Sequence, residues 1–200
     1  MAAQLKYELT AEDYLAIERE AEYKSEFYNG EMFAMAGASR AHVIIVSNLV
    51  AELRQKLKHR ACNVYSNDLR LRITATDLYT YPDVIVACGQ QFFADDQKDT
   101  LLNPTLIIEV LSDSTKDYDR GGKFAHYRKL DSLQEYILVA QDEAHIEHLV
   151  RTSDGWNFSE IDGLDATLQL TSIECEIPTA EIFDKVDFPI KPIIFEEREF

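Results

Sequence analysis

The sequence predicts an α/β or α+β fold in which a mixed central β-sheet is flanked by helices. Short apolar runs typical of buried strands lie at residues 81–87, 104–112 and 134–140. Residues 39–58 show the three- and four-residue apolar spacing of an amphipathic helix. The pair Asn29-Gly30 is a strong β-hairpin turn signal. Because such strand and helix patterns alternate along the chain, both kinds of element should contribute to one core.

The length and composition indicate a globular protein. The chain has 200 residues, of which 46% are hydrophobic, and it shows no repeat, low-complexity segment or linker. One domain over 1–200 is therefore expected, with a core of about 10–183 and a tail over 184–200. No stretch approaches 18 uninterrupted apolar residues, so no membrane span is expected. The first residues lack the basic and apolar regions of a signal peptide.

The three cysteines favour a reducing compartment. Cys62, Cys88 and Cys175 are odd in number and widely spaced, which is typical neither of a zinc site nor of a disulfide framework. A cytoplasmic location is therefore expected.

Negative charge is concentrated in the last third of the chain. The net charge is −16 overall, and residues 131–200 carry −13 of it. This total argues against a nonspecific nucleic-acid binder. The near-neutral first two thirds could still present a local basic surface, and the simplest interpretation of the acidic part is a solvated surface.

The first half of the chain predicts a helix, a hairpin, a long helix and strands. Thr10 with Asp13 resembles a capping box that starts a helix over about 11–20. A hairpin follows around Asn29-Gly30. The stripe of the long helix is made of five residues: Val43, Val46, Val50, Leu53 and Leu57. Residues 62–73 predict a strand pair or one bent strand.

The second half predicts strands, a glycine-containing helix and a second hairpin. Residues 90–100 predict a polar connection that is partly helical, and 113–130 a turn that runs into a helix weakened by two glycines. Residues 144–161 predict a hairpin around Asp154-Gly155. A short helix is expected over 178–183, and no element in the tail.

Two acidic residues accompany the buried strands. Asp83 precedes the apolar run VIVA, and Glu109 interrupts the run LIIEVL. Burying an unpaired carboxylate is costly. If the two strands are neighbours, as successive strands often are, both carboxylates converge on one place. Their repulsion would be resolved by a divalent cation, and Mg²⁺ suits a site with few protein oxygens and several waters.

The order of these motifs resembles a known family. The segments YPDVIV, LIIEVLS, STKDYDRGGKFAHYRKL and LQEYILV, together with FYNGEMFAMAGASRAHVIIVSNL, resemble the Uma2 family (DUF820) of restriction-endonuclease-like proteins within the PD-(D/E)XK nuclease superfamily. The resemblance runs from about Thr10 to Phe183. It implies a restriction-endonuclease-like mixed central sheet flanked by helices, with additional β-hairpins. It also implies metal-dependent phosphodiester hydrolysis as the ancestral activity.

The resemblance assigns roles by position. Asp83 and Glu109 would be metal ligands, with the Val110 carbonyl as a third, and the metal would be Mg²⁺ or Mn²⁺. The superfamily usually has lysine two residues after the second acid, where this sequence has Leu111. Lys123, early in the following helix, is the candidate that supplies the missing charge.

Glu31 is a third candidate carboxylate by the same resemblance, while His42 and Asp68 are weaker candidates. Each assignment has an ordinary alternative. Asp83 could cap a turn, and Glu31 could be a turn residue. Lys123 could be a solvated helix lysine paired with Asp119.

A further alternative pairs Glu109 with an arginine on a neighbouring strand, such as Arg70 or Arg72. His42 could equally be an ordinary residue at the start of a helix.

The expected function is a cytoplasmic, metal-dependent endonuclease that hydrolyses DNA, with no membrane partner and a homodimer as one candidate assembly. Two other functions stay open. One is a catalytically inactive nuclease-fold protein that serves as an interaction module, which the absent lysine and the net charge favour. The other is a metal-dependent hydrolase with a substrate other than DNA.

Overall fold

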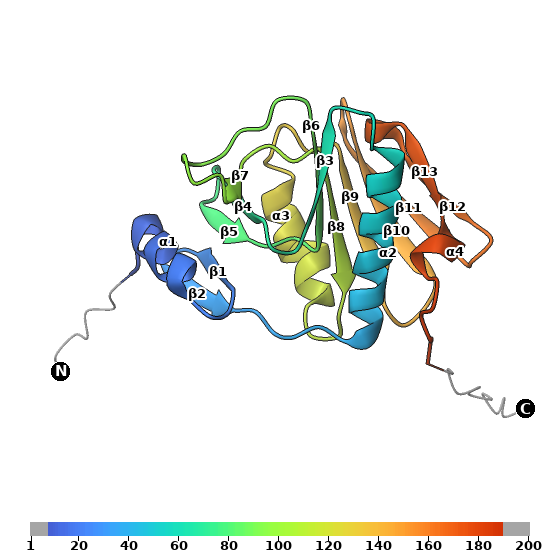
Figure 1. Ribbon diagram of the computed structural model, residues 1–200, viewed down its shortest axis with the longest axis horizontal. Coiled ribbons are helices and arrows are strands. Elements are labelled where there is room, and N and C mark those ends of the chain that lie inside the picture. Colours follow the sequence, from blue (N-terminus) through green and yellow to red (C-terminus); the bar gives the residue numbers. More distant parts are fainter. Residues whose placement is uncertain (1–7, 190–200) are drawn as a thin grey trace, which may run out of the picture.

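The computed structural model describes residues 8–189, which form three β-sheets with helices packed against them (Figure 1). The six-stranded sheet has the order β11-β10-β9-β8-β6-β3, and the five-stranded sheet has the order β2-β1-β5-β4-β7. The strands β12 and β13 pair with each other. In the six-stranded sheet β8 runs parallel to β9, whereas β6 and β8 are antiparallel. The predicted fold, a mixed α+β arrangement with additional hairpins, is confirmed.

The helical elements are α1 (Ala11–Glu20), α2 (Arg40–Lys56), the π-helix η1 (Tyr118–Lys123), α3 (Phe124–Tyr127), the 3₁₀ turn η2 (Thr171–Ile173) and α4 (Thr179–Ile182). The strands of the six-stranded sheet are β3 (Cys62–Ser66), β6 (Val84–Cys88), β8 (Leu106–Leu111), β9 (Glu135–Ala140), β10 (His145–Thr152) and β11 (Gly155–Asp162). The remaining strands are β1 (Ser25–Tyr28), β2 (Glu31–Ala34), β4 (Arg70–Ile73), β5 (Leu78–Thr80), β7 (Thr100–Leu101), β12 (Thr167–Leu170) and β13 (Cys175–Pro178).

The six-stranded sheet has two buried faces, because its central strands β8 and β9 are buried on both sides. Side chains alternate along β8, so Leu106, Ile108 and Val110 point to one face and Ile107, Glu109 and Leu111 to the other. The first face packs against α2, α4, β12 and β13. The second packs against α3, β4 and β5. Glu109 therefore enters the second core, beside α3.

The N-terminal helix and hairpin form a third cluster. Thr10 and Asp13 make the predicted capping box at the start of α1. The Tyr14 ring stacks on Phe27 with centroids 4.9 Å apart, and the Tyr14 hydroxyl donates to the Ser25 carbonyl. Because β1 buries Ser25 and Phe27 on this side, its alternate residues face away from α1.

The buried side of α2 differs from the predicted stripe. Val46, Leu53 and Leu57 are buried as expected, but Val43 is exposed. Ile45 and Leu49 are fully buried instead. The buried stripe is rotated along the helix because α2 packs on the β6 and β8 surface, which the sequence of the helix alone does not specify.

The segment 62–73, for which a strand pair or one bent strand was predicted, forms two strands, β3 and β4, which belong to different sheets. Other short strands were not predicted, and β5 lies in a region without a clear pattern. Residues 90–100 contain no helix and end in β7. The strands β12 and β13 lie in a stretch for which the sequence predicted no element. The tail prediction concerns residues 184–200, of which 190–200 lie outside the described part.

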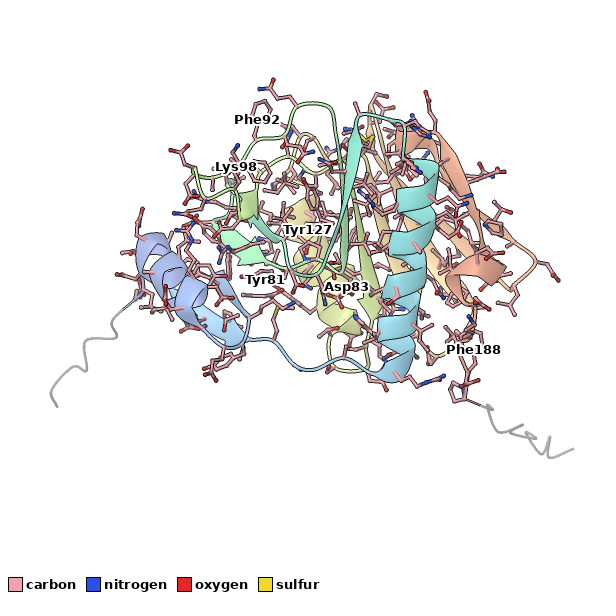
Figure 2. All side chains as sticks on the ribbon, viewed as in Figure 1. Tyr81, Asp83, Phe92, Lys98, Tyr127 and Phe188 are labelled. Carbon is pink, nitrogen blue, oxygen red and sulfur yellow. A yellow bond between two sulfur atoms is a disulfide. The ribbon has the colours of Figure 1, made fainter. Side chains whose placement is uncertain are left out.

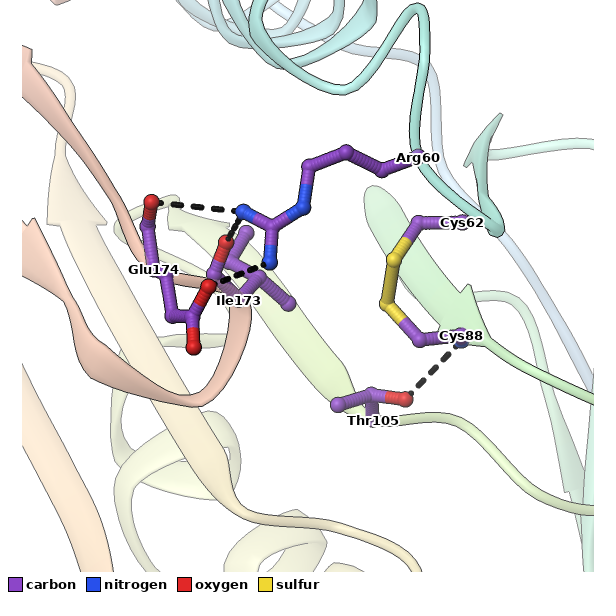
Figure 3. Close-up of a disulfide and its surroundings, with 6 residues drawn as sticks. All are labelled: Arg60, Cys62, Cys88, Thr105, Ile173 and Glu174. Atoms are coloured by element: carbon purple, nitrogen blue, oxygen red, sulfur yellow. Dashed lines mark hydrogen bonds and ion pairs between the residues drawn. A yellow bond between two sulfur atoms is a disulfide. The ribbon is translucent and has the colours of Figure 1, made fainter.

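The interpretation of the cysteines was wrong for two of them. Cys62 and Cys88 are directly opposite each other in the β3–β6 ladder and form a disulfide (Figure 3). The Cys88 backbone N–H donates to Thr105 Oγ1 at 3.0 Å, and nearby Arg60 pairs with Glu174. Cys175 is free. The absence of disulfides therefore cannot be used to argue for a reducing compartment.

Among residues 8–189, none of the helices combines the length and apolar content that crossing a bilayer requires.

Candidate active site

Asp83 lies directly before β6 and links three elements. Its Oδ2 accepts a hydrogen bond of 2.8 Å from the Val110 backbone N–H on β8. Its Oδ1 lies 3.0 Å from Nε2 of His42, near the start of α2. The Asp83 and His42 side chains are both partly accessible. Asp83 therefore ties β8 to α2 through partners far away in the sequence, whereas a turn-capping aspartate would bond within its own turn.

Glu109 is 3% exposed and is surrounded by hydrogen-bond donors. Its Oε1 accepts from the Tyr127 hydroxyl at 2.8 Å and lies 3.2 Å from Lys123 Nζ. Its Oε2 lies 3.3 Å from the backbone nitrogen of Asp83. Figure 2 shows Asp83 and Tyr127 in the middle of the molecule, where both contact this carboxylate. The two acids are thus adjacent at one end of β6 and β8.

The alternative prediction that Glu109 pairs with Arg70 or Arg72 is wrong. Arg70 contacts Thr100, Tyr81 and Asp99 instead. Arg72 pairs with Asp77 at 2.8 Å.

Lys123 is buried, with 7% of its surface exposed, and faces three carboxylates. Its Nζ lies 3.1 Å from Asp119, 3.2 Å from Glu109 and 3.5 Å from Glu26. The alternative interpretation of Lys123 required an ion pair with Asp119, and this pair is present. Oδ1 of Asp119 nevertheless accepts no hydrogen bond of good geometry. The same interpretation required a solvated lysine, and on that point it is wrong.

The π-helix η1 places Lys123 at this position. Gly122 permits close approach of the Tyr118 ring, since a Cβ at Gly122 would lie 2.4 Å from a Tyr118 ring carbon. The Tyr136 hydroxyl donates to the Asp119 carbonyl at 3.0 Å and fixes the turn to β9. The wider turn of a π-helix is common at functional sites. Gly122 therefore makes room for the Tyr118 ring, even though a glycine weakens an α-helix.

The electrostatics of the cluster are dominated by burial. The pKa of Glu109 is raised to about 8, chiefly by burial; the charge of Lys123 opposes this rise, and the charges of Asp83 and Asp119 add to it. Burial alone would lower the pKa of Lys123, but Glu109, Glu26 and Asp119 hold it well above its ordinary value. Lys123 is therefore a cation at neutral pH. Without a metal ion, a carboxyl proton resides in this cluster.

The N-terminal hairpin contributes a carboxylate that the sequence did not single out. Glu26 on β1 contacts Lys123 and accepts a hydrogen bond from Thr80. Glu31 opens β2 with an exposed side chain and lies directly opposite Tyr28, on the same face as Glu26. The period-two pattern of β1, with Phe27 buried, was the available signal for Glu26. Asp68 pairs with Lys24 at the surface and is 82% exposed.

The donor set of the cluster fits a hard divalent cation. Within residues 8–189 no group of three or more His, Cys, Asp or Glu side chains converges as a metal site. Mg²⁺, however, is commonly held by one or two carboxylates together with waters and substrate phosphate. Asp83 and Glu109 supply two adjoining carboxylates that repel each other. Because the N–H and C=O of a strand residue point to the same side, the Val110 carbonyl faces the same edge as Asp83.

Comparison with known proteins identifies the family. Residues 11–180 match the family model of Uma2, described as "Putative restriction endonuclease". The uncharacterized protein sll1609 of Synechocystis sp. is 37% identical over 164 residues, which cover 82% of this chain and 93% of that protein. The chain belongs to the Uma2 family.

Two further comparisons agree with this membership. A second Synechocystis sp. protein, the uncharacterized slr1290, is 37% identical over 149 residues, 74% of this chain and 76% of its own. A solved structure from Anabaena variabilis, described as "a putative nuclease belonging to DUF820", superimposes with a TM-score of 0.73. At 20% identity, covering 88% of this Uma2 chain and 97% of that chain, it shows the shared fold.

Proposed function

We propose that this chain is an endonuclease that hydrolyses DNA phosphodiester bonds with Mg²⁺ or Mn²⁺. The observation that carries the proposal is the convergence of Asp83, Glu109 and Lys123, which come from three elements, at one end of β6 and β8. Two adjoining carboxylates beside a buried ammonium are suited to phosphoryl transfer. Membership in the Uma2 family supports the same reaction class.

The lysine that the strand lacks is supplied from the helix. Leu111 is buried in the apolar cluster that includes Tyr127 and Tyr136. A lysine at that position would have to displace this packing. The Lys123 ammonium instead reaches Glu109 from η1, at 3.2 Å. A cation needs only to place its charge at the reacting point, so its position in the sequence can differ.

Asp83 and Lys123 have different roles in the proposed reaction. Asp83 is held by Val110 and His42, so its carboxylate is oriented before substrate binds. Lys123 orients the attacking water beside Glu109 and stabilises negative charge that develops on the phosphoryl oxygens. A Mg²⁺ held by Asp83 and Glu109 would supply Lewis-acid stabilisation of this charge. Water attacks phosphorus directly, the P–O bond to one sugar oxygen breaks, and that oxygen leaves and takes up a proton, with no covalent enzyme intermediate.

The proposal includes one domain over residues 1–200, DNA as the partner, and a cytoplasmic location, which rests on the DNA substrate and no longer on the cysteines. Glu31 is retained as a supporting carboxylate because it shares a face with Glu26. The homodimer remains a candidate assembly.

A plasmid assay tests the function. Supercoiled plasmid is incubated with the full chain and Mg²⁺ or Mn²⁺, beside Asp83→Asn, Glu109→Gln and the control Glu174→Gln. Glu174 is a surface acid paired with Arg60 on a different part of the molecule. Nicking by the parent and the control, and not by the other two variants, is expected. Thermal melting with and without metal is recorded for each protein.

Two results would contradict the proposal. Absence of both cleavage and metal-induced stabilisation removes the metal site. Stabilisation without cleavage favours the inactive interaction module or a hydrolase with another substrate. Such a site would still bind the ion through Asp83 and Glu109.

A further inference from the structure

Three exposed aromatic side chains lie on the elements that carry the Lys123 cluster, η1 and the β1–β2 hairpin. Tyr118 is 40% exposed, Tyr28 is 40% exposed and Phe33 is 49% exposed. We call these three residues the aromatic rim. Tyr127 and Tyr136, which pack beside the same cluster, are fully buried. The exposed rings therefore are not part of the core, and their exposure calls for another explanation.

Tyr118 is fixed at one side and open on the other. Its ring lies against Gly122, where a Cβ would collide with it. The Lys123 ammonium lies 5.9 Å from the ring centroid. The ring is thus positioned directly over the charged end of the candidate active site. A preorganised ring loses little conformational freedom when it stacks on a ligand.

Tyr28 and Phe33 reach the same place from the hairpin. Tyr28 and Glu26 alternate with buried Phe27 on β1, so both face η1 and α3. Phe33 lies directly opposite Glu26 in the β1–β2 ladder and shares this face. The Tyr28 ring packs edge-on against His126, with centroids 4.8 Å apart. Both rings therefore neighbour Glu26 on one face of the hairpin, and Glu26 contacts Lys123.

Cations near the rim are already neutralised. Lys123 faces three carboxylates. Arg120 of the same π-helix pairs with Glu147 at 2.7 Å. Lys116, just before it, pairs with Asp113. Attraction to phosphates alone would be weak here, and the chain carries a net charge of −16. Ring stacking supplies binding energy that does not depend on a charge surplus.

We propose that the aromatic rim stacks an unpaired nucleobase next to the phosphate being cleaved, so that the preferred substrate is single-stranded or locally unpaired DNA. This inference rests on the proposed function. In a duplex both faces of each internal base are covered by neighbouring pairs, so a protein ring can stack only where a base is unpaired or extruded. Tyr118 is the central residue because its ring lies beside the charged cluster, with the ring centroid 5.9 Å from the Lys123 ammonium.

Binding is measured directly. A fluorescein-labelled single-stranded DNA oligonucleotide and its duplex are titrated with the full chain in Ca²⁺, with anisotropy as the readout and gel analysis to verify that the DNA is intact. Stacking is worth about 1–3 kcal/mol per base, so Tyr118→Ala should weaken single-strand binding by about 5- to 150-fold. Tyr118→Phe keeps the ring and should bind as the parent does. Phe158→Ala removes an exposed ring on β11 and is the matched control.

Further substitutions and probes make the result specific. Tyr28→Ala should also weaken single-strand binding. It tests the proposal independently if Tyr118→Ala fails to fold. A rim that faces an abasic position has no base to stack on. Complexes centred on that position should therefore have the same affinity for the parent and for Tyr118→Ala. An RNA oligonucleotide of the same sequence is titrated beside the DNA, and tighter RNA binding would overturn the assignment to DNA.

The failures of the two proposals can be distinguished. Equal affinity for single strand and duplex, with Tyr118→Ala unchanged, overturns the stacking proposal even if plasmid is nicked. Ring-dependent single-strand binding without cleavage of either the plasmid or the single-stranded oligonucleotide in Mg²⁺ or Mn²⁺ supports stacking and contradicts the nuclease activity. Loss of binding in Phe158→Ala as large as in Tyr118→Ala would show that the effect is not confined to the rim and would overturn the proposal.

Discussion

The ammonium of Lys123 lies 3.2 Å from Oε1 of Glu109, although the two residues come from a π-helix and a buried strand. The same oxygen accepts a hydrogen bond from Tyr127. This contact places a lysine charge beside Glu109 from η1, as the proposed replacement for the lysine that is absent two residues after Glu109 requires. It also means that the site and the second core share their packing, so substitutions in the cluster should change stability as well as activity.

Lys123→Met should abolish plasmid nicking and lower the free energy of unfolding by about 3 kcal/mol, because it leaves buried carboxylates without their cation. Metal-induced stabilisation should persist, since Asp83 and Glu109 remain. Urea denaturation and the plasmid assay measure the two effects. Lys56→Met, which breaks a surface pair with Glu52, should cost under about 1 kcal/mol. Nicking by Lys123→Met at the parental rate would remove Lys123 from the mechanism.

The raised pKa of Glu109 predicts a pH dependence of stability in metal-free protein. The folded state binds a proton at Glu109 up to about pH 8, whereas the same carboxyl in the unfolded chain has its ordinary pKa of 4.5. This contribution is complete below the unfolded pKa and is lost as pH rises toward 8, at up to about 1.4 kcal/mol per pH unit.

Glu109→Gln should remove this slope, so its stability relative to the parent should grow from about pH 5 to about pH 8.5. Urea denaturation of both proteins in EDTA across this range measures the difference. A constant difference between parent and variant would show that Glu109 is ionised throughout.

His42→Ala should reduce nicking by about 10- to 100-fold and raise the Mg²⁺ concentration needed for half-maximal activity. The reason is that His42 Nε2 lies 3.0 Å from Asp83 Oδ1 and orients that carboxylate. His42→Gln, which can still donate a hydrogen bond, should recover part of the activity. His59→Ala, at an exposed position, should behave as the parent. An unchanged Mg²⁺ dependence in His42→Ala would contradict the orienting role.

Removal of the Cys62–Cys88 disulfide should lower the free energy of unfolding by about 3 kcal/mol, because the bond closes a loop with a sequence separation of 26. Thermal melting with and without a reducing agent tests this in the parent. The double variant Cys62→Ala/Cys88→Ala should melt at the lower temperature in both buffers. Rapid alkylation of both cysteines in the unreduced, folded protein would show that the bond is absent.

The sequence predicted the parts of the site that depend on local pattern. Asp83 and Glu109 could be brought together because each marks a buried strand and the two strands are neighbours, with Val84 opposite Ile108. Glu26 was missed because its importance arises only when the hairpin packs beside η1. His42 was a weaker candidate for a similar reason: its contact with Asp83 joins residues 41 positions apart.

The remaining differences in the fold have the same physical origin. The strands β5, β12 and β13 have three or four residues each and are stabilised by their ladder partners more than by their own pattern. The disulfide depends on the register of β3 against β6, which places Cys62 opposite Cys88. Neither register nor packing partner is encoded within a short window of sequence.

The geometry of η1 also limits how the chain length can vary. Lys123 contacts Glu109 because its side chain lies on the side of η1 that faces β8. On the same turn, the Tyr118 ring packs against Gly122. Deleting or inserting one residue between Tyr118 and Lys123 would change the turn of this π-helix and move the ammonium away from the carboxylates. Length differences between related chains should therefore fall in the turn at 112–115, and a motif search that requires a fixed spacing after Glu109 would overlook candidate sites of this kind.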